Sequence, residues 1–239
     1  MAYIRLDKYL ADAGLGTRSA VKQLVNKGRV TIDGVVCKKS EYKLDSATAV
    51  VLVDGRPVSY SEMAYYMLHK PAGVVSATND RRDKTVIELI DEEKRRDLFP
   101  VGRLDKDTEG LLLITNDGAL ANRLLAPGKH VSKCYFAKID GCVTDETVRL
   151  FAEGVDIGDD KLTAPAVLEI LTADKETSEI NITITEGRYH QIKRMFEAVG
   201  MQVTYLKRLS MGTLTLDPTL ACGAFRKLTE DEINKLQNP

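Results

Sequence analysis

The stretch PVGRLDKDTEGLLLITNDG, residues 100–118, combines two features that set the plan of this chain. Its first part is rich in charged residues and glycine, which is typical of a loop. Its second part contains the uninterrupted apolar run at residues 111–114, which predicts a buried strand. A loop that leads directly into such a strand holds its side chains on a rigid support. We therefore expect a functional site at this junction, at the edge of a cleft.

Apolar patterns on both sides of this stretch predict further strands and helices. Besides 111–115, the expected strands are residues 64–69, 134–139, 167–171 and 180–185. Apolar residues recur at helical spacing in residues 85–90, 118–125, 144–154 and 190–199. Because the strands do not alternate regularly with the helices, the order predicts an α+β fold on a mixed, mainly antiparallel sheet.

Residues before about 60 follow a different plan. A helix is expected over residues 5–13, and a second one, capped by Thr17 or Ser19, over the apolar positions 20–25. An Asp-Gly pair within residues 29–36 predicts a tight hairpin, because these residue types accept the positive φ angles of such a turn. A further strand is expected shortly before the join to the rest of the chain.

Charge is distributed unevenly between these two parts, although the whole chain has a net charge of only -1. Residues 1–60 contain ten basic and six acidic side chains, a balance of +4, and the remainder contains 24 basic and 29 acidic side chains, a balance of -5. The asymmetry indicates a small basic recognition module attached to a larger body. We predict two domains, residues 1–58 and residues 61–239.

The two helices and the hairpin of the first domain, with RLDKYL at residues 5–10 and GRVTIDG at residues 28–34, resemble the S4 RNA-binding domain. The resemblance implies that RNA is the partner of this module. Basic side chains on adjacent helices and the following turn neutralise phosphates, which makes the affinity for RNA electrostatic. The residues expected to do so are Arg5, Lys8, Arg18, Lys22, Lys27 and Arg29.

The second domain contains a motif whose resemblance is more specific. GRLD at residues 102–105, followed by TEGLL at residues 108–112, resembles the catalytic motif of the pseudouridine synthases, in the form of the ribosomal small-subunit family and its large-subunit relatives. Four further segments agree with that family in the expected order: LHKPAGV at 68–74, KCY at 133–135, EGRYHQIKRM at 186–195 and RLSMGTL at 208–214. The resemblance implies an enzyme that isomerises uridine in RNA.

Three catalytic residues follow from this resemblance. Asp105 matches the essential aspartate, which either attacks the ribose or the base as a nucleophile or removes the C2′ proton of the sugar; both routes stay open. Tyr135 matches the active-site tyrosine, which stacks on the flipped uracil and assists removal of the C5 proton. Lys193 matches the basic partner that pairs with Asp105 and keeps it ionised.

Two substrate-binding residues and one bystander follow in the same way. Arg103 is expected to hold a phosphate or to help extrude the nucleotide from its stack. Leu214 is expected to pack against the base. Asp107 lies close to the catalytic position but is interpreted as a surface or turn carboxylate.

Together these expectations describe a cytoplasmic, monomeric enzyme that converts one uridine of 16S rRNA to pseudouridine by base flipping, with no cofactor and no metal. Its partner would be a small-subunit assembly intermediate, and no apolar stretch approaches the roughly 20 residues of a membrane helix. One alternative is a relative that acts on 23S rRNA; the end of this chain soon after a predicted helix favours the 16S interpretation. The other alternative is a non-catalytic S4-type RNA-binding or ribosome assembly factor, against which the complete catalytic set argues.

Overall fold

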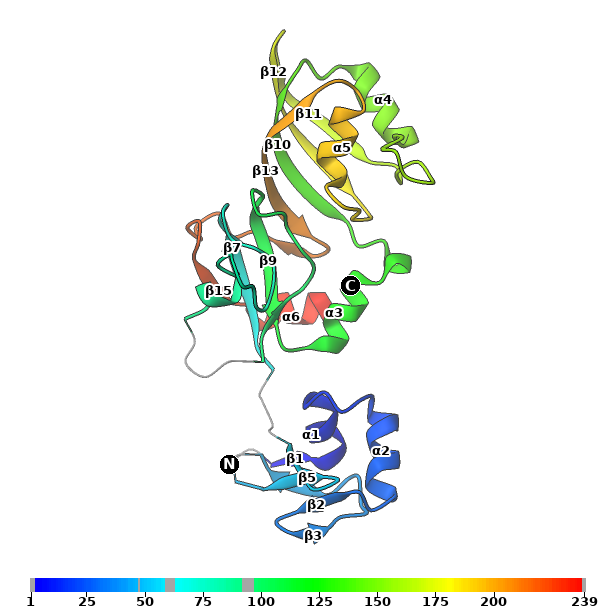
Figure 1. The fold of residues 1–239 in the computed structure, drawn as a ribbon, viewed down its shortest axis with the longest axis vertical. Helices are drawn as coiled ribbons and strands as arrows, with labels where there is room; N and C mark the ends of the chain where they lie inside the picture. Colours follow the sequence, from blue (N-terminus) through cyan, green and yellow to red (C-terminus); the bar gives the residue numbers. More distant parts are fainter. Residues whose placement is uncertain (1–2, 47, 59–62, 92–96, 238–239) are drawn as a thin grey trace. The chain divides into compact units, whose positions relative to one another are not determined.

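The computed structural model describes residues 3–46, 48–58, 63–91 and 97–237 (Figure 1). The chain separates into two compact units, Met1–Met63 (unit 1) and Ala64–Pro239 (unit 2). The predicted join at residues 59–60 lies outside the described residues.

Unit 1 packs two helices against short strands. The helices are α1 (Leu6–Asp12) and α2 (Arg18–Asn26). The strands are β1 (Tyr3–Arg5), β2 (Val30–Ile32), β3 (Val35–Val36), β4 (Lys43–Asp45), β5 (Val51–Val53) and β6 (Arg56–Val58). β1 pairs with β4, and the other four form an antiparallel sheet in the order β3-β2-β5-β6.

Local sequence explains these elements. The Thr17 hydroxyl accepts a hydrogen bond from the Ala20 amide and caps α2, as predicted. Of the apolar positions expected in this helix, Val21 and Val25 are buried and Ala20 is exposed. Asp33 and Gly34 have φ angles of 50° and 82°, as the predicted hairpin turn between β2 and β3 requires. The core of unit 1 consists of Leu6, Tyr9, Leu10, Val21, Val25, Val30, Ile32, Leu44, Val51 and Val53.

Unit 2 is built on one nine-stranded sheet. Its strands are β7 (Tyr65–Lys70), β8 (Phe99–Pro100), β9 (Glu109–Thr115), β10 (Lys133–Asp140), β11 (Val167–Ala173), β12 (Thr177–Ile184), β13 (Gln202–Met211), β14 (Leu214–Thr215) and β15 (Phe225–Lys227). Its helices are α3 (Gly118–Leu125), α4 (Asp145–Glu153), α5 (Gln191–Glu197) and α6 (Glu230–Gln237), with 3₁₀ turns η1 (Ile87–Leu89) and η2 (Pro127–Lys129).

The helix predicted over residues 85–90 is wrong apart from the single turn η1. Val75 and Thr85 form an isolated parallel bridge, and the Val86 amide donates to the Val75 carbonyl. These bonds hold the backbone of residues 85 and 86 against Val75, so the helical turn is limited to the three residues of η1.

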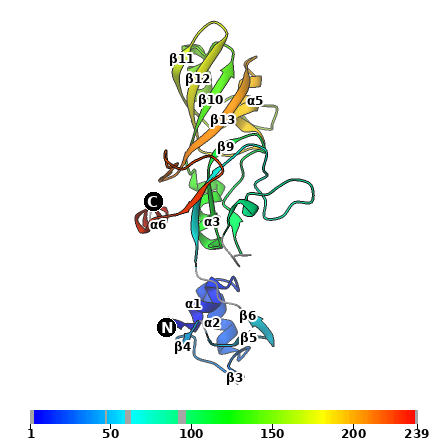
Figure 2. The same ribbon diagram turned by 90° about the vertical axis from the view of Figure 1, so that its left-hand side faces the viewer.

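The sheet order is β11-β12-β10-β13-β9-β7-β15, with β14 paired to β13 and β8 paired to β9. Figure 2 labels the first five of these strands. All these pairs are antiparallel except β13 with β9, which confirms the predicted mixed, mainly antiparallel sheet. The parallel pair is short: Lys207 lies opposite Glu109, and Arg208 lies opposite Gly110. A Cβ atom on Gly110 would overlap the carbonyl oxygen of Arg208, so this junction needs glycine.

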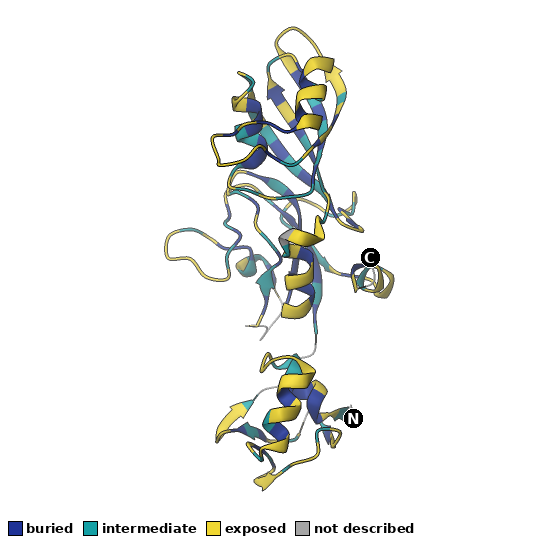
Figure 3. Ribbon diagram, turned by 90° about the vertical axis from the view of Figure 1, so that its right-hand side faces the viewer, coloured by how far each residue is buried: buried dark blue, intermediate teal, exposed yellow. Residues whose placement is uncertain are grey.

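Helices cover the two halves of the sheet separately. α4 and α5 lie beside the β11–β12–β10–β13 half, where Phe151 and Phe196 pack on its apolar side chains (Figure 1). Leu120 of α3 and Leu236 of α6 pack with Leu111 of β9 in the other half. Buried residues follow the strands, whereas the outer sides of the helices are exposed (Figure 3).

Candidate active site

A cavity of about 620 Å³ lies in unit 2 where the loop before β9 meets β10, β13 and the segment that starts α5. Its lining includes residues 102–106, residues 187–193, Lys133 and Tyr135 of β10, and Leu206, Arg208 and Met211 of β13. Charged and apolar side chains thus line the same cavity, and such a mixture suits a ligand with both apolar and polar groups.

Asp105 lies on the loop between β8 and β9, as the sequence predicts for this junction. The Thr108 amide donates to the Asp105 carbonyl at 3.1 Å, which closes a turn around the residue. The Asp105 side chain is 31% exposed and lines the cavity. Its carboxylate is thus accessible to a ligand and is held by a defined backbone turn.

Lys70, the last residue of β7, anchors the loop that carries Asp105. Its side chain is fully buried, and its Nζ donates to the carbonyl oxygens of Thr108 at 2.8 Å, Asp105 at 3.0 Å and Pro71 at 3.1 Å. Burial lowers the pKa of Lys70 to about 8, and the nearby aspartates oppose that change. Sequence reasoning did not single out this role; the signal was a lysine at the end of a largely apolar strand.

A serine fixes the loop from a second side. The Ser76 hydroxyl donates to the Leu104 carbonyl at 2.8 Å and accepts from the Leu104 amide at 3.0 Å. Both groups are buried, so the backbone directly before Asp105 has no water to bind instead. The loop is therefore pre-organised in the absence of substrate.

Lys193 of α5 lies between two carboxylates. Its Nζ is 3.4 Å from Asp105 Oδ2, and it donates to both oxygens of Asp107 at 2.7 and 2.8 Å. Partial burial opposes ionisation of Asp107, but the bonds from Lys193 outweigh it and lower the Asp107 pKa. The same two aspartates raise the pKa of Lys193 against the effect of burial. Asp107 is exposed as expected, yet it is a closer partner of Lys193 than Asp105 is.

His190 and Tyr189 line the cavity next to Asp105. The Nε2 atom of His190 is 3.6 Å from Asp105 Oδ1. The two rings are stacked, with centroids 3.8 Å apart and planes inclined by 17°. Sequence reasoning quoted both residues within a motif but assigned neither a role.

Tyr135 and Arg103 both reach the cavity. Tyr135 is only 7% exposed, and its neighbours in the sheet are Ile182 of β12 and Arg208 of β13. Arg103 is exposed on the loop beside Asp105. Lys133, two residues before Tyr135, has its pKa lowered by burial and then by the charge of Arg208. The structure therefore brings Asp105, Tyr135, Lys193 and Arg103 to one cavity, and their roles stay predictions.

Leu214 is placed elsewhere. It is buried against Leu111, Leu124 and Met211 in the core beside α3 and α6, and it is not part of the cavity lining. The β13–β14 turn pairs Leu214 with Met211, which belongs to the same core cluster and, unlike Leu214, also lines the cavity. The predicted contact of Leu214 with a base stays a prediction that this position does not favour.

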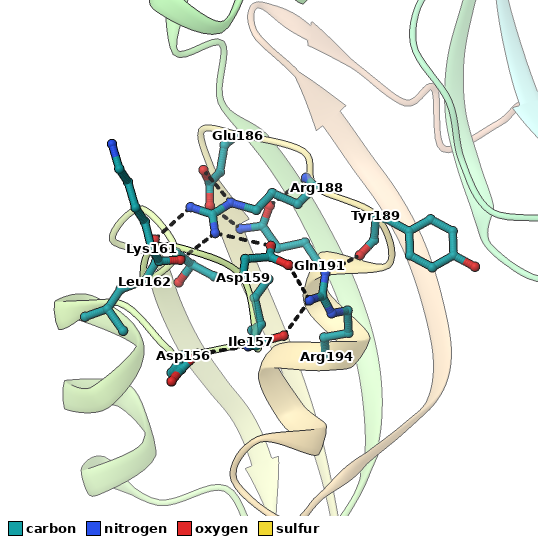
Figure 4. Close-up of polar contacts among 12 residues, drawn as sticks. Asp156, Ile157, Asp159, Lys161, Leu162, Glu186, Arg188, Tyr189, Gln191 and Arg194 are labelled. Carbon is teal, nitrogen blue, oxygen red and sulfur yellow. Dashed lines mark hydrogen bonds and ion pairs between the residues drawn. The ribbon is translucent and has the colours of Figure 1, made fainter.

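A network of charged side chains supports the segment that carries His190 (Figure 4). Arg188 donates to the carbonyl oxygens of Lys161 and Leu162 at 2.7 Å each and pairs with Glu186 at 3.2 Å. Arg194 pairs with Asp159 at 2.6 Å. The two arginines thereby tie residues 157–162 to the start of α5.

The basic residues predicted for RNA binding in unit 1 are all exposed: Arg5, Lys8, Arg18, Lys22, Lys27 and Arg29. Two of them already bind carboxylates, Arg5 with Asp7 at 2.8 Å and Arg29 with Asp54. These pairs reduce the net positive potential of the module.

The described part of the chain offers neither a metal-binding cluster nor a membrane-spanning helix. It contains no group of three or more His, Cys, Asp or Glu side chains that could hold a metal ion. Within the same residues, no helix is long and apolar enough to cross a membrane.

Comparison with known proteins identifies both units. The RNA pseudouridylate synthase family matches residues 64–198, and the S4 domain matches residues 4–50. The chain is 50% identical over 237 residues to "Uncharacterized RNA pseudouridine synthase YtzG" of Bacillus subtilis (strain 168), covering 99% of both chains. It is 41% identical over 232 residues to "Ribosomal small subunit pseudouridine synthase A" of Escherichia coli (strain K12), covering 96% of this chain and 98% of the relative.

A solved structure agrees over the whole length. The crystal structure of a pseudouridylate synthase superimposes with a TM-score of 0.71 at 35% identity, covering 98% of this chain and 99% of the other. The cavity with Asp105, Tyr135 and Lys193 thus lies in the part of the chain that the synthase family matches. We conclude that this chain is a member of the RNA pseudouridylate synthase family, an isomerase with an amino-terminal S4 domain.

Proposed function

We propose that this protein converts one uridine of 16S rRNA to pseudouridine during assembly of the small ribosomal subunit. The observation that carries the proposal is the convergence of Asp105, Tyr135 and Lys193, from three distant segments, on one cavity. The choice of 16S rRNA is supported by the relatives that are named ribosomal small subunit pseudouridine synthase A.

The proposed reaction starts with a uridine flipped into the cavity. Asp105 removes the C2′ proton of the ribose or attacks the substrate directly, and the bond between C1′ and N1 of uracil breaks. The uracil turns and forms a new bond from C5 to C1′, while Asp105 returns the C2′ proton or, in the nucleophilic route, its bond to the substrate breaks. The C5 proton then leaves and N1 gains a proton. Nothing is added or lost overall, which agrees with a site made only of acid–base and nucleophilic groups.

Each proposed role has physical support in the site. Lys193 is close enough to Asp105 to favour its carboxylate form. Tyr135 presents a ring and a phenol at the inner wall, so it is suited both to stack on uracil and to assist transfer of the C5 proton. Arg103 is exposed at the rim, where a phosphate of the flipped nucleotide would pass.

The experiment is to map pseudouridines in 16S and 23S rRNA transcripts, and in small-subunit assembly intermediates, after incubation with the purified chain. Wild type is expected to modify one uridine of 16S rRNA, Asp105→Asn none, and Asp107→Asn the same uridine as wild type. Modification confined to 23S rRNA would replace the substrate in this proposal. RNA binding without any new pseudouridine would favour a non-catalytic assembly factor.

A further inference from the structure

We infer that Tyr189 is a stacking platform for an unpaired RNA base next to the flipped uridine. The inference rests on the proposed function and adds a second nucleotide-binding position to it. Tyr189 is 75% exposed, the largest exposed fraction of any large apolar side chain in the described residues. An aromatic ring left so open at the edge of a cavity has one face available for a ligand.

The platform has a fixed position relative to the catalytic group. One face of the Tyr189 ring is covered by His190 at 3.8 Å, and the Nε2 atom of His190 is 3.6 Å from Asp105. A base on the other face would add one more stacking interval of about 3.4 Å, the rise per nucleotide in a stacked strand. That places it within the reach of the nucleotide that precedes or follows a uridine bound at Asp105.

The backbone under Tyr189 is held in place by hydrogen bonds. His190 has a φ of 48°, a left-handed conformation that a histidine keeps only where its surroundings impose it. Gln191 is buried and accepts from the Arg188 amide at 2.9 Å, and Arg194 donates to the Tyr189 carbonyl at 3.3 Å. The Tyr189 ring points away from this polar network (Figure 4). A pre-organised ring loses little entropy when a base binds to it.

Base flipping supplies the physical reason for such a platform. Removing a uridine from its stack leaves its neighbours without a stacking partner, which costs a few kcal/mol. Stacking of one neighbour on Tyr189 recovers part of that cost, and it does so for any base because every base has a π face. The exposed basic side chain of Arg103, on the same cavity, would accompany the phosphates between the two nucleotides.

The chain contains no tryptophan, so a Tyr189→Trp variant carries a single fluorescent reporter at the platform. Its matched control is Val167→Trp, at a residue of β11 that is 71% exposed and does not line the cavity. The probes are two fluorescein-labelled RNA heptamers with a central uridine, one flanked by adenines and one by abasic sites. We expect the adenine-flanked heptamer to quench the Tyr189→Trp variant and to leave the Val167→Trp variant unchanged.

Affinity measured by anisotropy gives the second readout. Wild type and Tyr189→Phe are expected to bind the adenine-flanked heptamer about tenfold more tightly than the abasic one, a factor that corresponds to about 1.4 kcal/mol. Tyr189→Ala is expected to lose that preference. Equal affinity of wild type for the two heptamers, or quenching that is the same at both tryptophan positions, would overturn the inference.

Pseudouridine formation in rRNA transcripts separates this inference from the proposed function. Wild type that forms pseudouridine but shows no Tyr189-dependent preference refutes the platform and leaves the synthase standing. Wild type that shows the preference but forms no pseudouridine refutes the synthase and leaves the platform standing. Where both hold, Tyr189→Ala is expected to raise KM about tenfold while the single-turnover rate at saturating RNA changes less than threefold.

Discussion

Replacing Gly110 by alanine is predicted to destabilise unit 2, because Gly110 lies where β9 and β13 run side by side. Its φ is 106°, and an added Cβ would overlap the Arg208 carbonyl oxygen and lie 2.6 Å from the Arg208 amide nitrogen. The backbone conformation costs alanine about 1–3 kcal/mol. Moving the strands apart costs about 1–3 kcal/mol more. The expected loss in the free energy of unfolding is therefore about 2–6 kcal/mol, a large share of the stability of a typical domain.

Gly200→Ala is the matched control. Gly200 follows α5 with a φ of 73°, and nothing lies within 4 Å of an added Cβ. Alanine there meets only the backbone cost, about 1–2 kcal/mol. Urea unfolding in a Val167→Trp background, followed by fluorescence, reports on unit 2 of the full chain. A loss of stability at Gly110 no larger than the loss at Gly200 would refute the argument that the β9–β13 approach requires glycine.

Four further predictions concern the site and the RNA-binding module. Asp105→Ala is expected to lower the single-turnover rate of pseudouridine formation by more than about a thousandfold, which corresponds to about 4 kcal/mol. Asp107→Ala is expected to lower it by less than tenfold, because of the two aspartates only Asp105 lines the cavity. Similar losses in both variants would contradict the assignment of Asp105. Tyr135→Phe is expected to keep RNA affinity and to lose most product formation, and normal activity would exclude the phenol from proton transfer. Burial lowers the Lys70 pKa from 10.5 to about 8, so between these pH values the unfolded chain binds one proton more than the folded chain. The free energy of unfolding of wild type should therefore rise with pH over this range, by up to about 3 kcal/mol relative to Lys70→Met. Parallel pH profiles of the two proteins would contradict the lowered pKa. Joint reversal of Arg18 and Lys22 to Glu is expected to flatten the salt dependence of RNA binding without loss of stability. Arg5→Glu should also destabilise unit 1, because it leaves the buried Asp7 without its partner. An unchanged salt slope in the double variant would show that Arg18 and Lys22 do not contact RNA.

Much of the fold follows from short-range patterns. The spacing of Leu6, Tyr9 and Leu10 predicts one helical face, and all three are buried in α1. The Asp33-Gly34 pair predicts a turn that has the expected positive φ angles. The apolar run at residues 111–114 predicts a buried strand, and β9 is covered on both sides, with Leu111 and Leu112 in different core clusters. Such features depend on neighbours within a few residues, so the sequence contains them directly.

The candidate site was only partly predictable. The motif resemblance named Asp105, Tyr135 and Lys193, but it indicated neither that Asp107 takes the shorter bonds to Lys193 nor that Leu214 turns into the core. The predicted helix over residues 85–90 failed for a related reason, since a distant backbone bridge decided that segment.

The sequence by itself determined the two-part plan, the type of most elements and the residues with the right chemistry for the reaction. Only the tertiary structure decided which of those residues meet. Asp105, Tyr135 and Lys193 reach one cavity because β13 pairs with β10 on one side and with β9 on the other, a register set by contacts between residues about 60 to 100 positions apart. Lys70 likewise acquires its role only when its ammonium group reaches carbonyl oxygens more than 30 residues away. Periodicity is a local property, whereas strand register and the partner of a charged group depend on how the whole chain packs.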